Sequence, residues 1–280
     1  MLSYRHAFHA GNYADVLKHT ALCQALHHLT QKDGALRYID THAGVGAYSL
    51  HSSQAHQTDE YQQGIGAIWE APNPPPALAA YLKLVKTFNG GGLLNAYPGS
   101  PWFAQQILRA HDRLELCELH PQDFPALQRQ MAGDRRVHCH FEDGFARSLA
   151  LMPPIERRGL VLIDPSYEIK DDYQTVVAHI KTLHRRFATG VYMLWYPVVD
   201  ERRIKTLCNQ FKTSGMRKIQ RYEWGLDTDG NQPGMSATGM IVVNPPWGLM
   251  ADMQAALNFA LPRVAPAGTG YVLCEELVGE

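Results

Sequence analysis

Apolar residues along this chain gather in short runs rich in β-branched and aromatic side chains, and longer segments with helix-like spacing separate most of these runs. Strands that alternate with helices in this way build a parallel sheet with helices on both faces. The pattern therefore predicts an α/β fold. The predicted strands are residues 36–40, 113–118, 136–141, 159–163, 190–196, 216–223 and 239–243.

The interval between the first two predicted strands breaks this rhythm. About seventy residues lie between positions 40 and 113, whereas a simple βαβ unit takes roughly 30 residues. The piece around 53–95 holds helix-like segments, the proline run "APNPPPA" and the glycine run "NGGG", which mark turns. We therefore expect one domain over residues 1–280, with a small helical insertion at 53–95 on the edge of the sheet.

The first predicted strand ends in Asp40, and Gly44 and Gly46 follow in "DTHAGVG". Glycines here let the backbone approach a ligand, and such sheets bind ligands at the carboxyl ends of their strands. The dinucleotide pattern Gly-x-Gly-x-x-Gly is incomplete, because Ser49 stands at the third glycine position. The turn indicates a ligand site but disfavours a nicotinamide enzyme.

Acidic residues also follow the next three strands: Glu118, Asp143 beside Gly144, and Asp164. Glu118 is suited to accept both hydroxyls of a ribose, and Asp143 to accept the amine of an adenine. A single acid of this kind is usually a solvated loop residue. Four at successive strand ends are expected to lie together, because the ends of parallel strands meet at one edge of the sheet. They predict a pocket for adenosine that carries a charged group.

Composition sets further limits. The chain is 45% hydrophobic, which is ample for a buried core. No stretch reaches the roughly 20 apolar residues of a membrane span, and the start of the chain lacks the apolar core of a signal peptide, so we expect a cytoplasmic protein. The five cysteines form no Cys-x-x-Cys pair, which favours core thiols. We interpret His27, His28, His138 and His140 as surface or structural residues, and we expect no metal site.

The net charge is −1, but the charge is unevenly distributed. Residues 181–221 carry ten basic side chains against two acidic ones, a local excess of +8. Neutralising phosphates is the main sequence-independent contribution to nucleic-acid binding. This cluster, which includes Arg202 and Arg203, is therefore a candidate phosphate-binding surface. The alternative is an ordinary solvated helix face.

Taken in order, Asp-x-His-Ala-Gly-x-Gly at 40–46, the acid at 118, Asp-Gly at 143–144 and Asp-Pro-Ser-Tyr at 164–167 resemble the motifs of class I S-adenosylmethionine-dependent methyltransferases that act on amino groups. The segments "MLSYRHAFHAGNYADVLKHT", "YPGSP", "RFATGVYMLWYPVV" and "GMIVVNPPW" are similar to the RlmJ family, bacterial methyltransferases that modify an adenine of 23S ribosomal RNA. The resemblance covers essentially the whole chain. Ser166 replaces the second proline that is usual in the fourth motif.

The resemblance implies a Rossmann-like methyltransferase sheet with S-adenosylmethionine as cofactor and S-adenosylhomocysteine as product. It places His19 and His42 beside the cofactor, and Ser100, as the cap of a helix beginning near Trp102, on the methionine carboxylate. The full set of implied cofactor-binding residues is His19, His42, Gly44, Ser100, Glu118, Asp143, Gly144 and Asp164.

The fourth motif suits methylation of an adenine amine. That amine is a poor nucleophile because its lone pair is delocalised into the ring. Asp164 and the carbonyl of Pro165 can accept its two N–H bonds and aim the lone pair at the methyl group. Tyr167 is expected to stack on the base, and the anionic Asp164 to stabilise the charge that grows on nitrogen.

The resemblance also places Tyr4, His6 and Lys18 near the target nucleoside. We expect a helix from about Asp15, preceded by a flexible arm of Tyr4, Arg5 and His6 with Gly11 as its hinge. Arg202 and Arg203 complete the expected substrate-binding residues.

The sequence thus predicts an enzyme that methylates N6 of a specific adenine in 23S ribosomal RNA, either naked or in an early assembly intermediate. A DNA adenine methyltransferase is one alternative, although such enzymes usually need a separate target-reading domain. A non-catalytic RNA-binding protein is the other, although it would not require four acids at strand ends.

Overall fold

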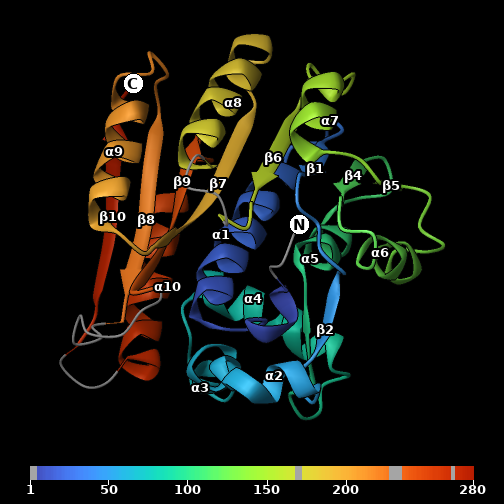
Figure 1. Cartoon of the computed structure of the whole chain (residues 1–280), viewed down its shortest axis with the longest axis vertical. Helices are drawn as coiled ribbons and strands as arrows, with labels where there is room; N and C mark the ends of the chain where they lie inside the picture. Colours follow the sequence, from blue (N-terminus) through green and yellow to red (C-terminus); the bar gives the residue numbers. More distant parts are fainter. Residues whose placement is uncertain (1–4, 168–171, 227–234, 266–268) are drawn as a thin grey trace.

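An eight-stranded sheet runs through the molecule (Figure 1). The computed structural model describes residues 5–167, 172–226, 235–265 and 269–280. In spatial order, the strands of this sheet are β10 (Tyr271–Val278), β8 (Ile219–Gly225), β9 (Ala237–Val243), β7 (Val191–Val198), β6 (Gly159–Ile163), β1 (Arg37–Asp40), β4 (Arg113–Cys117) and β5 (Val137–His140). All seven predicted strands are present, and β10 was not predicted.

Helices connect most of these strands. They are η1 (His6–Phe8), α1 (Tyr13–Thr30), α2 (Ser53–Thr58), η2 (Glu60–Gln63), α3 (Ile65–Ile68), α4 (Pro76–Phe88), α5 (Ser100–Ile107), α6 (Phe124–Gln130), α7 (Gly144–Leu151), α8 (Asp172–Arg186), α9 (Glu201–Lys212) and α10 (Leu249–Val264). Among the described residues, no helix is both long enough and apolar enough to span a bilayer.

The sheet is parallel on one side and antiparallel on the other. Strands β5, β4, β1, β6 and β7 are parallel, as predicted. β9 is antiparallel to both β7 and β8, and β10 is antiparallel to β8, so the prediction of a wholly parallel sheet is wrong here. The physical reason lies in chain length: residues 226–236, which join β8 to β9, are fewer than the dozen or so that a parallel crossover requires.

Helices cover both faces of the sheet, each over its own apolar core. On β1, Tyr38 belongs to the core that includes side chains of α1, α5 and α10, whereas its neighbour Ile39 belongs to the core that includes side chains of α8 and α9. This alternation is the period-2 pattern of a strand buried on both faces. Figure 1 shows α8 and α9 on one side of the sheet, with α1 and α10 behind it.

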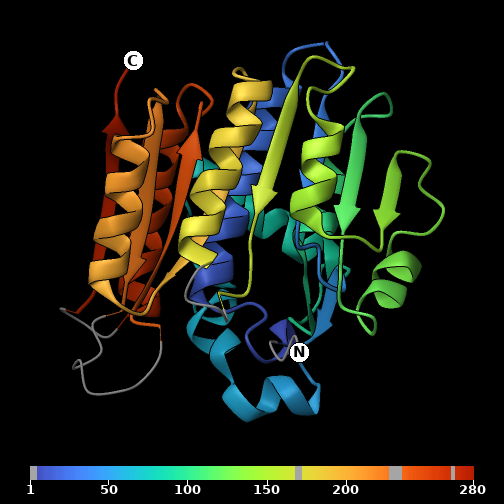
Figure 2. The same cartoon turned by 45° about the horizontal axis from the view of Figure 1, so that its top comes forward.

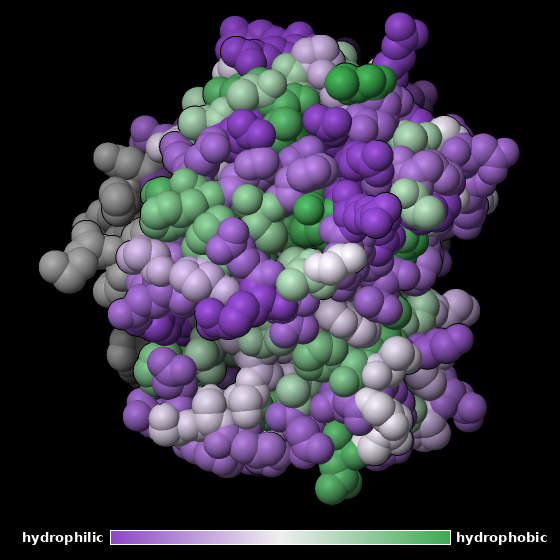
Figure 3. Space-filling view, turned by 90° about the vertical axis from the view of Figure 1, so that its right-hand side faces the viewer, coloured by the Kyte–Doolittle hydropathy of each residue, from purple (hydrophilic) through white to green (hydrophobic). Residues whose placement is uncertain are grey.

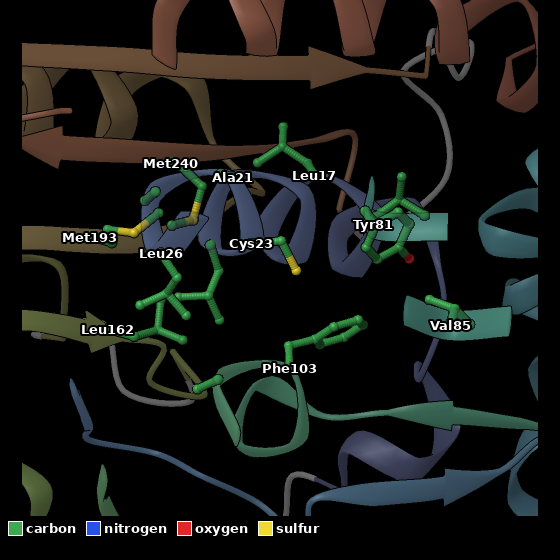
Figure 4. Packing of buried hydrophobic residues seen from close by; sticks show 14 of the residues in the cluster. Leu17, Ala21, Cys23, Leu26, Tyr81, Val85, Phe103, Leu162, Met193 and Met240 are labelled. Atoms are coloured by element: carbon green, nitrogen blue, oxygen red, sulfur yellow. The ribbon is translucent and has the colours of Figure 1, made fainter. Parts of the chain in front are cut away.

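The segment 53–95 contributes to the larger core. Its helix α4 contacts α1 and α10, so it covers a helical layer and does not simply hang on the edge of the sheet. Figure 4 shows Tyr81 and Val85 of α4 near Phe103 of α5 and the α1 side chains. At the base of the segment, β2 (Ala47–Ser49) and β3 (Ala96–Pro98) form an antiparallel pair.

The edge strand β5 is short, with only four residues. Figure 3 shows this side of the molecule, where hydrophilic residues predominate and hydrophobic ones are scattered. A short edge strand within a polar surface offers few unpaired backbone groups to another chain, which limits edge-to-edge association.

We expect Phe103→Ala to lower the free energy of unfolding by about 3–5 kcal/mol, because this fully buried ring joins α5 to the α4 segment. Urea denaturation followed by circular dichroism measures the change. Leu93→Ala is the control: its side chain is 79% exposed, so the expected change is within about 0.5 kcal/mol. Equal losses in both variants would contradict this description of the core.

Candidate active site

A cavity of about 550 Å³ opens where β1, β4 and β6 end. Its volume lies within the range of roughly 300–1,000 Å³ that is typical of small-molecule sites. Figure 2 shows the arrowheads of these strands pointing toward the side of the molecule that carries the N-terminal residues. The predicted residues that line the cavity are His6, Lys18, His19, His42, Gly44, Ser100, Glu118, Asp143, Gly144, Asp164 and Pro165.

The carboxylate of Asp40 organises the turn that follows β1. It is fully buried, and its Oδ2 accepts hydrogen bonds from the Tyr38 hydroxyl at 2.8 Å and the Ser100 hydroxyl at 2.7 Å. Its Oδ1 accepts the His42 backbone N–H at 3.3 Å. Burial raises the pKa of Asp40 to about 6, against the opposing effect of the Ser100 and Tyr38 hydrogen bonds.

The position of Ser100 corrects one prediction. Helix α5 begins at Ser100 itself with Gly99 as its N-cap, and no side chain caps it, so Ser100 does not cap a helix starting near Trp102. Its hydroxyl is instead donated to Asp40. The amino end of α5 still faces the cavity, where Gly99 and Ser100 belong to the lining. A carboxylate there would meet backbone N–H groups.

Gly44, in the turn after β1, and Glu118, after β4, both line the cavity and are joined by a hydrogen bond. Gly44 has φ +62°, a backbone conformation that favours glycine, and a Cβ there would also displace the Tyr48 hydroxyl, which would lie 2.4 Å away. Its N–H donates to Glu118 Oε2 at 2.8 Å, and the His120 N–H donates to Oε1 at 2.7 Å. Burial raises the pKa of Glu118. Each oxygen keeps a second lone pair that can accept a ribose hydroxyl.

Asp143 and Gly144 begin helix α7. The Asp143 side chain is the N-cap and accepts the Phe145 N–H at 2.9 Å. A Cβ on Gly144 would lie 2.0 Å from the Thr41 carbonyl oxygen. The close packing of the start of α7 against Thr41 therefore requires glycine at this position.

Lys18 lies between two carboxylates at the end of β6. Its Nζ is 2.6 Å from Asp164 Oδ2 and 2.9 Å from Asp15 Oδ1. Burial lowers the pKa of Lys18, but the attraction of Asp15 and Asp164 outweighs this effect and holds the pKa well above its usual value. A charged ammonium therefore holds Asp164 in place beside the cavity.

Two of the histidines that line the cavity, His19 and His42, are neutral. Burial lowers the pKa of His42 to about 4 and the pKa of His19 well below its usual value. His19 Nδ1 is 2.7 Å from the hydroxyl of Tyr97, which lies 2.9 Å from that of Tyr81. Sequence reasoning missed both tyrosines, because they reach His19 from the segment around the insertion and no local motif marks them.

Tyr167 does not occupy the expected place. It has φ +54°, its hydroxyl donates to the Trp195 carbonyl at 2.6 Å, and its ring packs on Tyr173 with centroids 4.5 Å apart. It is not among the residues that line the cavity, whereas Trp195 is. The ring of Tyr167 therefore does not belong to the cavity lining, and it contacts Trp195 and Tyr173 instead.

Trp195 reaches the cavity from β7, and no motif in the sequence marks it as a site residue. Its indole N–H donates to Thr238 at 2.8 Å, which fixes the ring, and Lys18 Nζ lies 5.8 Å from the ring centroid. Alternation along β7 predicts that the residue is on one face of the sheet, but not that it reaches the cavity.

The N-terminal residues that the structure describes are held in place. His6 Nε2 is 2.9 Å from Asp15 Oδ2, and the Arg5 guanidinium contacts Gln122 and Asp123. The expectation of a flexible arm is therefore wrong for Arg5 and His6, while Tyr4 lies outside the described residues. Helix α1 begins at Tyr13, close to the predicted start.

The basic cluster does not form a single surface. Arg202 and Arg203 lie at the start of α9, directly after the carboxyl end of β7, on the edge of the sheet where the cavity opens, although they do not line it. Arg185 and Arg186 end α8, which leads into the amino end of β7 at the opposite edge. Arg221 is bound to Glu223 at 2.7 Å within the sheet. The excess of +8 in the sequence is thus divided by the fold.

The remaining histidines and cysteines have structural surroundings. His28 is 3.0 Å from Asp252, and His140 is 2.7 Å from Glu115. Three of the cysteines are buried and two are half-buried, all with free thiols. Over the described part of the chain, no group of three or more His, Cys, Asp or Glu side chains is arranged to hold a metal ion.

The strand order identifies the class of protein. Strands β4 and β5 lie on one side of β1, whereas β6 and β7 lie on its other side. The strand order therefore reverses at β1, and the cavity lies at this topological switch point. The acids after β1, β4, β5 and β6 reach this cavity or its wall, and an antiparallel strand, β9, is inserted between β7 and β8. The fold and the site are those of a class I methyltransferase.

Comparison with known proteins identifies the family. Residues 33–277 match the family described as "Ribosomal RNA large subunit methyltransferase D, RlmJ". The chain is 48% identical to Ribosomal RNA large subunit methyltransferase J of Escherichia coli and 46% identical to that of Haemophilus influenzae, each over the full length of both chains. A crystal structure of a Legionella pneumophila protein has 37% identity and a TM-score of 0.90, covering 96% of this chain and 98% of that one. The chain belongs to the RlmJ family of methyltransferases.

We expect Asp40→Asn to change the pH dependence of stability. Because the folded-state pKa of Asp40 is about 6, above its unfolded value, its contribution is fully present below pH 4 and is lost as the pH rises through 6. The asparagine amide can donate to the Tyr38 and Ser100 hydroxyls and carries no charge. Relative to wild type, the variant should gain about 2 kcal/mol of unfolding free energy between pH 4 and pH 7. Urea titrations across this range test it, and a pH-independent difference would contradict it.

Proposed function

We propose that this protein transfers a methyl group from S-adenosylmethionine to the exocyclic N6 amine of an adenine in 23S ribosomal RNA. The observation that carries the proposal is the placement of Asp164 and Pro165 at the end of β6, on the wall of the cavity and in contact with a buried ammonium. Membership of the RlmJ family and the names of the Escherichia coli and Haemophilus influenzae relatives support the ribosomal RNA substrate.

The donor set of the cavity fits the cofactor. Glu118 is fixed by two backbone N–H groups, and we propose that it accepts the ribose hydroxyls while Asp143 accepts the adenine amine. The amino end of α5 at Ser100 provides N–H groups for the methionine carboxylate. Neutral His19 and His42 add no positive charge beside a sulfonium. S-adenosylmethionine, when bound, supplies an electrophilic methyl group.

The chain's own residues prepare the amine. Lys18 binds Oδ2 of Asp164, so Oδ1 is the carboxylate oxygen free of that bond and available to an amine N–H. The Pro165 carbonyl accepts the second N–H, which directs the nitrogen lone pair toward the methyl group. The Asp164 carboxylate then stabilises the positive charge that develops on nitrogen.

Trp195 is the aromatic side chain that we propose lies against the target base. Its ring is fixed by Thr238 and belongs to the cavity lining, near Asp164 and Lys18. A base that stacks on it must leave its neighbours in the RNA, which favours naked RNA or an early assembly intermediate over a folded subunit. Such a substrate is consistent with action in the cytoplasm.

We expect Asp164→Ala to reduce methyl transfer at least about 100-fold, because the amine loses its acceptor and its charge stabilisation. Transfer of tritium from labelled cofactor to 23S ribosomal RNA measures activity, and calorimetry should still detect cofactor binding by the variant. Asp33→Ala, an exposed acid outside the cavity, is the control and should keep full activity. Near-normal turnover of the Asp164 variant would refute the mechanism.

The same assay distinguishes substrates. Naked 23S ribosomal RNA, assembled large subunits and DNA of the same sequence are compared with wild-type protein. Label in the naked RNA, located at adenine N6 by nuclease digestion and mass spectrometry, supports the proposal. Label in DNA alone would favour the DNA adenine methyltransferase instead.

We expect charge reversal at Arg202 and Arg203 to weaken RNA binding and to reduce the slope of log affinity against log salt by roughly one for each phosphate that the variant no longer neutralises. The fold offers a matched control, since Arg185→Glu with Arg186→Glu changes charge equally at the opposite edge of the sheet. The control should keep the wild-type slope. Equal effects from both pairs would contradict a phosphate-binding role specific to the start of α9.

A further inference from the structure

Asp15 is a buried carboxylate with three hydrogen-bond donors around it. Its side chain is 1% exposed. Its Oδ1 is 2.9 Å from Lys18 Nζ, and its Oδ2 accepts the Gly11 N–H at 2.8 Å and lies 2.9 Å from His6 Nε2. Lys18 and His6 line the cavity, whereas Asp15 lies behind them.

We propose that Asp15 is a positioning residue for methyl transfer, which holds Lys18 on one oxygen of Asp164 and holds His6 at the cavity wall. The proposal rests on the proposed function, because it concerns the orientation of Asp164. Asp15 itself does not touch the substrate.

The first argument concerns the oxygens of Asp164. An ammonium has three donor protons, and Lys18 directs them toward two carboxylates on different sides. Without the Asp15 carboxylate, the Lys18 ammonium would keep only Asp164 of these two carboxylates. It would move toward Asp164 and compete with the substrate amine for both carboxylate oxygens. The adenine amine would then lose the acceptor that aligns it. Asp15 keeps Lys18 on Oδ2 and leaves Oδ1 to the substrate.

The second argument concerns His6. Because the Asp15 carboxylate can only accept, the Nε2 atom of His6 carries a proton in this contact. The ring also meets Tyr48 edge to face, with centroids 5.0 Å apart. Asp15 thus fixes the orientation of the imidazole that faces the cavity, as well as the Gly11 turn that joins η1 to α1.

A purely structural role for Asp15 can be separated from this one. The start of α1 is capped by Asn12, whose side chain accepts the Asp15 N–H at 3.1 Å. Asn12→Ala therefore loosens the same helix end but leaves the Asp15 carboxylate with its partners. Asn12 does not line the cavity, so this variant is a matched control.

The test replaces Asp15 with asparagine, which has the same shape but only one acceptor oxygen for three donors. We expect kcat to fall about 30-fold or more, with the KM for RNA and the cofactor Kd within about threefold of wild type, because alignment is lost while binding remains. Asn12→Ala should keep kcat within about threefold of wild type, even if it lowers the Tm by as much as Asp15→Asn does.

Three results would overturn the proposal: an unchanged kcat in Asp15→Asn, an equal fall of kcat in Asn12→Ala, or a loss confined to cofactor binding. Asp15→Ser leaves space for a water among the donors and serves if the asparagine variant does not fold; its wild-type kcat would be equally decisive against the proposal. If wild-type protein labels DNA and not RNA, the proposed function fails. The role of Asp15 is then still tested, because the ratio of variant to wild-type kcat can be measured on DNA.

Discussion

The Lys18 ammonium, buried between the carboxylates of Asp15 and Asp164, is the interaction on which the rest of the site depends. A buried charge is costly unless it is paired and hydrogen-bonded, so both carboxylates must be present where Lys18 lies. This requirement joins the first turns of α1 to the end of β6. It also ties the residues before α1 to the cavity, because Asp15 binds His6 and the Gly11 backbone.

The same principle shapes the remaining wall of the cavity. Asp40 and Glu118 are carboxyl groups whose oxygens accept hydrogen bonds from nearby loops, and burial raises the pKa of each. These bonds fix the turn after β1 against α5 and against the end of β4. Polar groups that already have hydrogen-bond partners move little when a ligand binds. Preorganisation of this kind reduces the entropic cost of ordering the site on binding.

The sequence also contains a second motif that only the fold can interpret. Asn244-Pro245-Pro246-Trp247 has the two consecutive prolines that are usual in the fourth methyltransferase motif, whereas Asp164-Pro165-Ser166-Tyr167 has only one. It follows β9, which runs antiparallel to β7, so it lies at the edge of the sheet opposite the cavity. There Asn244 donates to the carbonyls of Ala188 and Gly190, and Trp247 is 93% exposed. Strand direction, which no local pattern encodes, decides which motif reaches the cavity.

The sequence by itself determined the seven strands with apolar runs, the α/β class and the acids at the strand ends, because period and composition are local properties and the ends of parallel strands must meet. It did not indicate β10, whose half-exposed edge position needs no apolar run and tolerates Glu275 and Glu276. Tertiary structure alone decided the antiparallel side of the sheet, the division of the basic cluster between two edges, the contacts of Tyr167 with Trp195 and Tyr173, and the contact of Asp15 with Lys18 and His6. Each of these depends on strand direction or on contacts between segments distant in the chain, and such features have no periodic signature in the sequence.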